Sequence, residues 1–206
     1  MKPKEGRIKE LLRERGLDGA IVSSPENFHY VTGFGGHQHT VSRQPGFTLA
    51  VMRSDDKAPT HITTMDFEAA TFRIKSAGLG FVVDPYDTWV GLKTWPEISQ
   101  GAVLPDKTRM ESSADKLEQF VKACDLADKR IGVEMDYLTV PYYNMICEKF
   151  PEAQLVDISD LFVYARSIKT EEEIKMFREL CRIADHGFTQ VSRMAGIGVS
   201  EKEMSD

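Results

Sequence analysis

The chain has 206 residues, with 26 Lys and Arg against 32 Asp and Glu, which gives a formal net charge of −6 at pH 7. A hydrophobic fraction of 41% with 28% charged residues is typical of a folded domain and excludes a disordered chain. Without a basic stripe, a signal core or a run of about 20 apolar residues, the sequence predicts a cytoplasmic protein that binds neither nucleic acid nor a membrane.

Helices and strands are expected to alternate along the first 160 residues. Apolar residues at helical spacing or in short β-rich runs, separated by Gly, Pro and polar turns, define these segments. The expected helices are 4–15, 67–75, 113–126 and 142–149, and the expected strands are 20–22, 47–52, 61–64, 81–83, 131–135 and 155–158. The polar turn between 47–52 and 61–64 predicts an antiparallel hairpin.

Three segments of this first part carry more specific expectations. Residues 25–34 are expected to form a loop, with Asn27 bonding its own backbone and aromatic residues fixing the loop on the sheet. Phe67, Ala70 and Ile74 are expected to share one face of their helix. Residues 86–107 lack clean periodicity and predict an irregular excursion with one helical turn.

The last forty residues predict one long helix and the start of another. Thr170 and Glu173 form a capping box that opens a helix whose apolar residues recur at steps of three and four up to Ala195. Ser200 and Glu203 form a second capping box shortly before Asp206. A single turn cannot stabilise itself, so we expect this chain to be a piece of a longer protein, against the alternative of a frayed natural terminus.

The alternation of helices and strands, with at least one antiparallel pair, predicts an α/β fold around a mixed β-sheet flanked by helices. We expect one domain over 1–160, followed over 161–206 by a linker and the first helix of a second, truncated domain. The three cysteines, Cys124, Cys147 and Cys181, lie in helix bodies among apolar neighbours and are expected to be buried, inert thiols.

Several segments, in order and spacing, resemble the amino-terminal domain of the creatinase, prolidase and aminopeptidase P family, the pita-bread metallohydrolases. The segments that carry the resemblance are Arg7-Ile-Lys-Glu-Leu-Leu12, Gly16-Leu-Asp-Gly-Ala-Ile-Val22, Ser24-Pro-Glu-Asn-Phe-His-Tyr-Val-Thr-Gly-Phe34, Arg166-Ser-Ile-Lys169 and Gly198-Val-Ser-Glu201. The resemblance implies a three-layer sandwich with a ribonuclease H-like motif over 1–160 and the entry of a catalytic domain after it.

The same resemblance implies what the chain does and what it lacks. Family members hydrolyse C–N bonds, most often with two divalent metal ions such as Mn, Co or Zn, held by aspartates, a histidine and glutamates of the carboxy-terminal domain. Those positions lie beyond Asp206, so we expect no metal ligands and no catalytic residues in this chain. Its expected role is in a homodimer of a metal-dependent Xaa-Pro peptidase, next to its own catalytic domain, where it serves dimerisation and covers the active site.

Two other functions stay open at this point. A creatinase-like amidinohydrolase is the alternative within enzymes, and creatinase itself departs from the metal pattern. A protein-binding module without catalysis is the alternative from another class, because a histone-chaperone subunit carries the same architecture. The presence or absence of the family's metal ligands downstream of Asp206 discriminates the peptidase from the binding module.

Five residues are candidates for contact with the substrate of a neighbouring subunit. His37, His39 and Arg43 follow the threonine-glycine-phenylalanine motif, where relatives make such contacts in trans, and Trp89 and Trp95 lie in the irregular segment. The alternatives are exposed loop histidines, a metal site of two histidines on one strand face, and tryptophans that pack under their own loop. A third metal ligand is missing near the histidines, which argues against the metal.

Overall fold

The computed structural model describes residues 3–55, 58–88, 94–101 and 111–205. It divides into two compact units, 1–165 and 166–206, and each is described by itself. In the described residues, no helix combines the length and the apolar character that a membrane span requires.

Unit 1 is built on one six-stranded mixed sheet in the order β4-β3-β2-β1-β5-β6. The strands are β1 Gly19–Val22, β2 Leu49–Arg53, β3 His61–Thr63, β4 Val82–Val83, β5 Arg130–Val133 and β6 Gln154–Asp157. Only β2 runs antiparallel to its neighbours β1 and β3, whereas β1, β5 and β6 are mutually parallel, as are β3 and β4. This arrangement confirms the expected hairpin and the expected α/β class with a mixed sheet.

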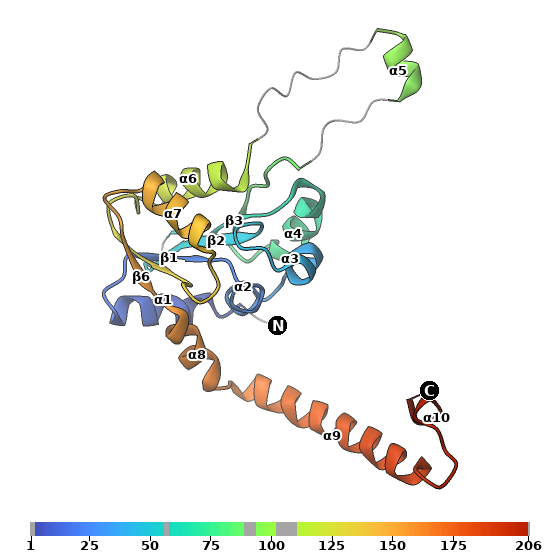
Figure 1. The fold of residues 1–206 in the computed structure, drawn as a ribbon. Helices are drawn as coiled ribbons and strands as arrows, with labels where there is room; N and C mark the ends of the chain where they lie inside the picture. Colours follow the sequence, from blue (N-terminus) through green and yellow to red (C-terminus); the bar gives the residue numbers. More distant parts are fainter. Residues whose placement is uncertain (1–2, 56–57, 89–93, 102–110, 206) are drawn as a thin grey trace. The chain divides into compact units, whose positions relative to one another are not determined.

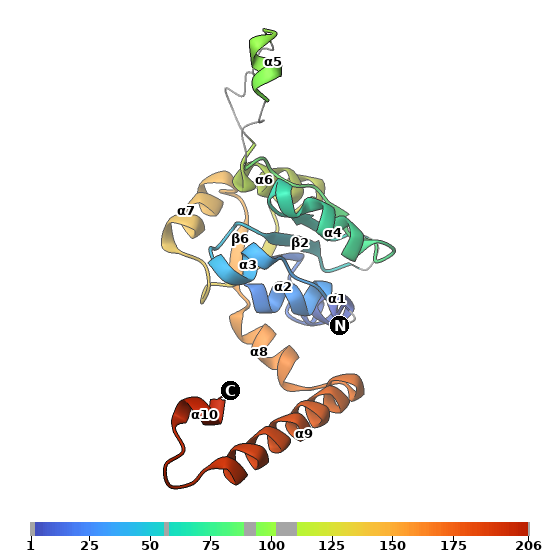
Figure 2. The same cartoon turned by 90° about the vertical axis from the view of Figure 1, so that its right-hand side faces the viewer.

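Helices cover both faces of the sheet (Figures 1 and 2). The helices of unit 1 are α1 Glu5–Glu14, α2 Pro25–Thr32, α3 His37–Ser42, the 3₁₀ turn η1 Asp66–Glu68, α4 Ala69–Ser76, α5 Trp95–Ser99, α6 Ser113–Ala123, α7 Val140–Lys149 and α8 Ser159–Ser167, of which α8 runs two residues past the unit boundary. One core joins the sheet to α1, α2 and α8, and a second joins it to α6 and α7.

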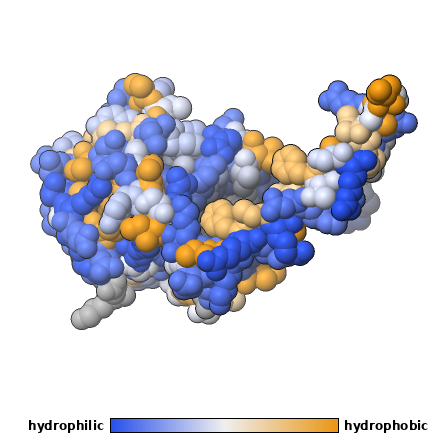
Figure 3. Space-filling model, turned by 90° about the horizontal axis from the view of Figure 1, so that it is seen from below, coloured by the Kyte–Doolittle hydropathy of each residue, from blue (hydrophilic) through white to orange (hydrophobic). Residues whose placement is uncertain are grey.

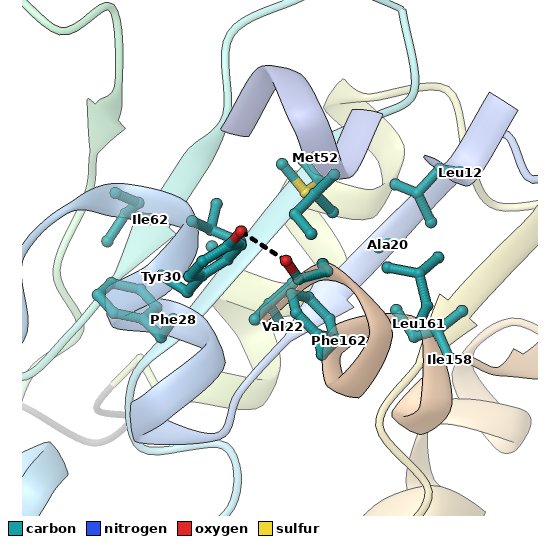
Figure 4. Close-up of a cluster of buried hydrophobic side chains, with 14 of the residues drawn as sticks. Leu12, Ala20, Val22, Phe28, Tyr30, Met52, Ile62, Ile158, Leu161 and Phe162 are labelled. Atoms are coloured by element: carbon teal, nitrogen blue, oxygen red, sulfur yellow. Dashed lines mark hydrogen bonds between the residues drawn. The ribbon is translucent and has the colours of Figure 1, made fainter. Parts of the chain in front are cut away.

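Strand β1 shows how the sequence divides these two cores. Ala20 and Val22 face the core with α1, α2 and α8, and Ile21 between them faces the core with α6 and α7. This is the two-residue alternation of a strand, applied to a sheet that is buried on both faces. In the first core the Tyr30 hydroxyl donates to the Ala165 carbonyl oxygen at 3.0 Å, which ties α2 to α8 (Figure 4). Leu161 and Phe162 are fully buried there, so the segment expected as a linker begins inside the core.

One local expectation is wrong, and a second did not identify the buried side of its helix. Residues 25–34 are not a loop, because Ser24 caps α2, with Pro25 in its first turn and Gly33 in the left-handed conformation (φ 81°) at its end. Phe67, Ala70 and Ile74 do share one side, but that side is exposed, with Phe67 at 51% and Ile74 at 77%. Phe72 is the residue that α4 buries in the core.

Unit 2 contains α9 Glu171–Met194 and α10 Glu201–Ser205. Both capping boxes expected from the sequence are formed, with Thr170 Oγ1 and Ser200 Oγ each accepting the backbone N–H of the glutamate three residues on. The apolar residues of α9 are largely exposed, among them Phe177, Leu180 and Phe188. Figure 3 shows hydrophobic residues, in orange, between hydrophilic ones on the face that it views.

Candidate functional site

The parallel strands β1 and β5 place polar residues next to each other where they end. Ile21 pairs with Val133 in this ladder, so Ser23 and Ser24 after β1 lie beside Glu134 after β5. The carboxyl ends of neighbouring parallel strands are the usual location of sites in α/β sheets. Helix α3 lies at the same place, because its His39 contacts the Ser23 carbonyl oxygen.

The Glu134 side chain is 1% exposed and accepts four hydrogen bonds. Its Oε2 takes the backbone N–H groups of Ser23 at 2.5 Å and Ser24 at 3.0 Å. Its Oε1 takes the Ser24 hydroxyl at 2.5 Å and Asn27 Nδ2 at 2.6 Å. Burial raises the pKa of this carboxyl, and the four donors oppose that shift. Glu134 therefore fixes the start of α2 to β5, which is a structural role.

His39 is buried at the same edge and is only 1% exposed. Its Nε2 lies 2.7 Å from the Ser23 carbonyl oxygen, which requires Nε2 to carry the proton, and its ring contacts that of Phe28 edge-on. Its Nδ1 has no hydrogen-bond partner in the described part of the chain. Burial lowers the pKa of His39, so the neutral ring is the stable form.

The two histidines do not share a strand face, because residues 37–42 form helix α3. Positions two apart on a helix are separated by about 200° around its axis. His37 is accordingly exposed while His39 is buried, so the interpretation of both as exposed loop histidines is wrong for His39. The described part of the chain contains no group of three or more His, Cys, Asp or Glu that could hold a metal ion.

Arg43 ends α3 in the left-handed conformation, with φ 50°. Its guanidinium donates to both carboxylate oxygens of Glu26 at 2.6 and 3.1 Å, a bidentate pair on the surface. This contact raises the pKa of Arg43. The side chain is exposed and held in a defined direction, so it can meet a group from outside this domain.

Of the two candidate tryptophans, Trp95 begins α5 and is 77% exposed, so it does not pack under its own loop. Trp89 lies outside the residues that the structure describes. The structure brings His37, His39 and Arg43 together on α3, but Trp95 belongs to a separate segment.

Ser23 and Ser24, the two serines that follow β1, are buried and therefore not accessible as nucleophiles. The Ser24 hydroxyl donates to Glu134 inside the core, and burial raises the pKa of the Cys124 thiol. Cys147 is half-buried and Cys181 is exposed, so the expectation of apolar burial holds for Cys124 but not for Cys181.

Sequence reasoning did not find Glu134 or the role of Asn27. The available signal was a single acidic residue directly after the apolar run 131–133, at the end of a strand that is buried on both faces. A charged residue at such a position is rarely left without partners. Asn27 was assigned to a local turn, whereas its amide reaches across 107 positions of sequence.

The comparisons with known proteins agree with this fold. The Creatinase/Prolidase N-terminal domain model matches residues 6–168. The uncharacterized peptidase YqhT of Bacillus subtilis is 28% identical over 196 residues, which cover 95% of this chain and 44% of that protein. The chain thus spans about half the length of the curated relatives it matches.

Two solved structures show the same fold. An Xaa-Pro dipeptidase from Bacillus anthracis has a TM-score of 0.67 and 22% identity, covering 97% of this chain and 45% of that one. A proline dipeptidase from Streptococcus pneumoniae has a TM-score of 0.57 and 21% identity, covering 81% of this chain and 99% of that one. With the family model matching most of its length, the chain belongs to the creatinase/prolidase N-terminal domain family.

Proposed function

We propose that this chain is the non-catalytic N-terminal domain of a metal-dependent Xaa-Pro peptidase of the cytoplasm, and that it serves dimerisation and covers the active site. The observation that carries this proposal is the family match over 6–168, combined with peptidase relatives of which the chain covers less than half.

The chemistry of the described residues supports a non-catalytic role. Glu134, Ser24 and His39 are engaged with one another or with backbone inside the core. These residues do not fit a pair of divalent ions, which would require several converging carboxylates. The Mn, Co or Zn ions of the proposed enzyme would be bound by residues outside this chain.

Helix α9 supports the presence of a catalytic domain as the partner of this chain. A helix that is apolar along one side gains stability by burying that side against another surface. Ile174, Phe177 and Cys181 lie along one side of α9 together with Arg178 and Asp185. We propose that the protein's own catalytic domain packs against this side.

The candidates for contact in trans remain proposals. His37 and Arg43 on α3, with Trp95 and Trp89, would reach the substrate in the partner's active site, and Arg43 would offer a cation already oriented by Glu26. His39 would act indirectly, because its buried ring holds α3 against Ser23.

The first experiment compares the whole protein with the 206-residue chain. Both are assayed with Mn²⁺ or Co²⁺ on Xaa-Pro dipeptides and on creatine. The proposal expects the whole protein to hydrolyse the dipeptides and the 206-residue chain to be inactive. Turnover by the 206-residue chain would refute the non-catalytic role, and hydrolysis of creatine alone would favour the amidinohydrolase. No hydrolysis by either would favour the protein-binding module.

The second experiment tests the contacts in trans. His37→Ala and Arg43→Ala in the whole protein should each raise KM by about fivefold, which corresponds to about 1 kcal/mol of lost binding. Arg73→Ala, an exposed cation on α4, is the control and should leave KM unchanged. If His37→Ala and Arg43→Ala leave KM as unchanged as Arg73→Ala does, the proposed contacts are wrong.

A further inference from the structure

A second feature of the loop between α2 and α3 is an open groove on its outer side, with a volume of about 700 Å³. Its walls are the loop itself, the exposed side of α3 and the end of α4. The lining residues used below are His29, Phe34, His37, Val41, Lys75 and Leu79.

We propose that this groove binds a carboxylate carried by a small apolar group, such as an amino acid or the carboxyl end of a short peptide. His37, which lines the groove, is also one of the residues proposed above to contact substrate in trans, so the two proposals share this residue. Binding by the 206-residue chain alone tests the groove without any peptidase activity.

The charge of the groove is opposite to that of the chain. Its ionisable lining side chains are His29, His37 and Lys75, and no acidic side chain of the described residues lines it, whereas the whole chain carries a formal charge of −6. Burial lowers the pKa of His29, so the Lys75 ammonium is the charge that attracts an anion to this concave surface.

Lys75 supplies the permanent cation. Its Nζ donates to the Gly35 carbonyl oxygen at 3.2 Å, so the ammonium lies at the loop rather than extending into solvent. An ammonium group has three donors, and this contact uses one of them. The remaining two can bind a carboxylate placed between the loop and the end of α4.

The groove also has an apolar part that a bare anion would leave uncovered. Val41 is 65% exposed and Leu79 is 41% exposed, and both line it. Arginine, which binds phosphate in a fork, is missing from its described lining. A molecule with a carboxylate at one end and an aliphatic side chain at the other therefore matches the groove better than inorganic phosphate.

The wall formed by the loop is fixed before any ligand arrives. A Cβ on Gly36 would lie 2.5 Å from Glu68 Oε2, so the backbone of the loop rests directly on that side chain. Glu68 Oε1 accepts the backbone N–H of Gln38 at 3.1 Å, and Oε2 accepts the Thr64 hydroxyl at 3.4 Å. The Glu68 carboxylate therefore accepts hydrogen bonds behind the loop and does not line the groove. A preformed site loses less conformational freedom when it binds.

The experiment uses the ¹⁵N-labelled 206-residue chain near neutral pH, where a lysine ammonium and a free carboxylate are both charged. N-acetyl-leucine is titrated against its neutral amide, N-acetyl-leucinamide, and against inorganic phosphate. A tetrapeptide ending in leucine, as acid and as amide, separates a free small molecule from a chain end. The variants are Lys75→Gln and the matched control Arg73→Gln, an exposed cation on the same helix outside the groove.

The proposal expects saturable shifts of the Gly35 and Gly36 amide signals with N-acetyl-leucine and much weaker ones with the amide and with phosphate. Lys75→Gln should weaken binding by about threefold or more, as expected for one exposed charge, and Arg73→Gln should not. Equal binding of acid and amide, no saturation, or equal loss in both variants would overturn it. Melting temperatures equal to that of the unsubstituted chain would show that both variants are folded.

Discussion

Replacing Glu134 by alanine is the most direct test of how the segments that follow β1 and β5 are held together. The substitution removes the acceptor of four hydrogen bonds and leaves the N–H groups of Ser23 and Ser24, the Ser24 hydroxyl and the Asn27 amide without it. Each buried donor left without a partner costs about 1–3 kcal/mol. These costs are not additive, because the space left by the side chain admits water. We expect a loss of about 3–5 kcal/mol in the free energy of unfolding.

A glutamine at the same position separates hydrogen bonding from charge. Its carbonyl oxygen can accept the N–H groups of Ser23 and Ser24, and its NH₂ group can donate to Asn27 if the Asn27 amide turns over. That turn is open to Asn27, because its Oδ1 has no hydrogen-bond partner among the described residues. Glu134→Gln should therefore cost about 1–2 kcal/mol, the difference between charged and neutral hydrogen bonds.

Urea unfolding followed by far-UV circular dichroism measures both variants against the unsubstituted chain. A cost below about 1 kcal/mol for Glu134→Ala, or equal costs for alanine and glutamine, would refute the reasoning.

The pH dependence of the free energy of unfolding gives a second measurement. The raised pKa means that the folded state keeps this proton at pH values where the unfolded chain has lost it. This contribution to stability is complete below pH 4.5 and is lost as pH rises through the folded pKa, and Glu134→Gln should lack it.

Two further predictions concern neighbouring positions. The lowered pKa of His39 means that its contribution to stability is present above pH 6.5 and is lost as pH falls through the folded pKa, because the unfolded chain takes up the proton first. His39→Gln should remove that part of the pH dependence in the same urea experiment, and an unchanged profile would contradict it. Gly46→Ala should cost about 2 kcal/mol or more, since φ is 84° and the added Cβ would lie 2.1 Å from the Tyr142 ring. Gly78→Ala, with φ 77° and no atom within 4 Å, should cost only about 1 kcal/mol, and equal melting temperatures for the two variants would contradict the role of Tyr142.

The parts of the fold that are determined by residues close together in the sequence are predictable. The capping box of Thr170 and Glu173 and the start of α9 agree to the residue, since every group involved lies within three positions. The expected strand at 20–22 became β1, because its apolar run between Gly19 and a proline leaves few other conformations. The family motif at 24–34 is recognisable in the sequence, but its helix is not, because that helix depends on the cap that Ser24 supplies.

Helical spacing did not identify the buried side of α4, because one polar residue decides it. Helical spacing alone allows Phe67 and Ile74 to point inward. In the structure the Glu68 carboxylate accepts the backbone N–H of Gln38 and the hydroxyl of Thr64, and this turns the side of Glu68 and Phe72 toward the sheet. The spacing of apolar residues alone does not predict that a carboxylate such as that of Glu68 is buried and accepts hydrogen bonds there.

The candidate site was the least predictable part, and the reason is the distance in sequence between its partners. Glu134 meets Asn27 across 107 positions, and His39 meets the Ser23 carbonyl across 16. Whether His39 points into the core or toward a ligand depends on partners that are distant in sequence. The presence of a histidine at this position therefore does not distinguish these two orientations. Buried groups of this kind are favourable only when all their partners arrive together, which the order of strands β1 and β5 achieves. The exposed residues of α3 therefore take their positions from a hydrogen-bond network that becomes visible only in the folded chain.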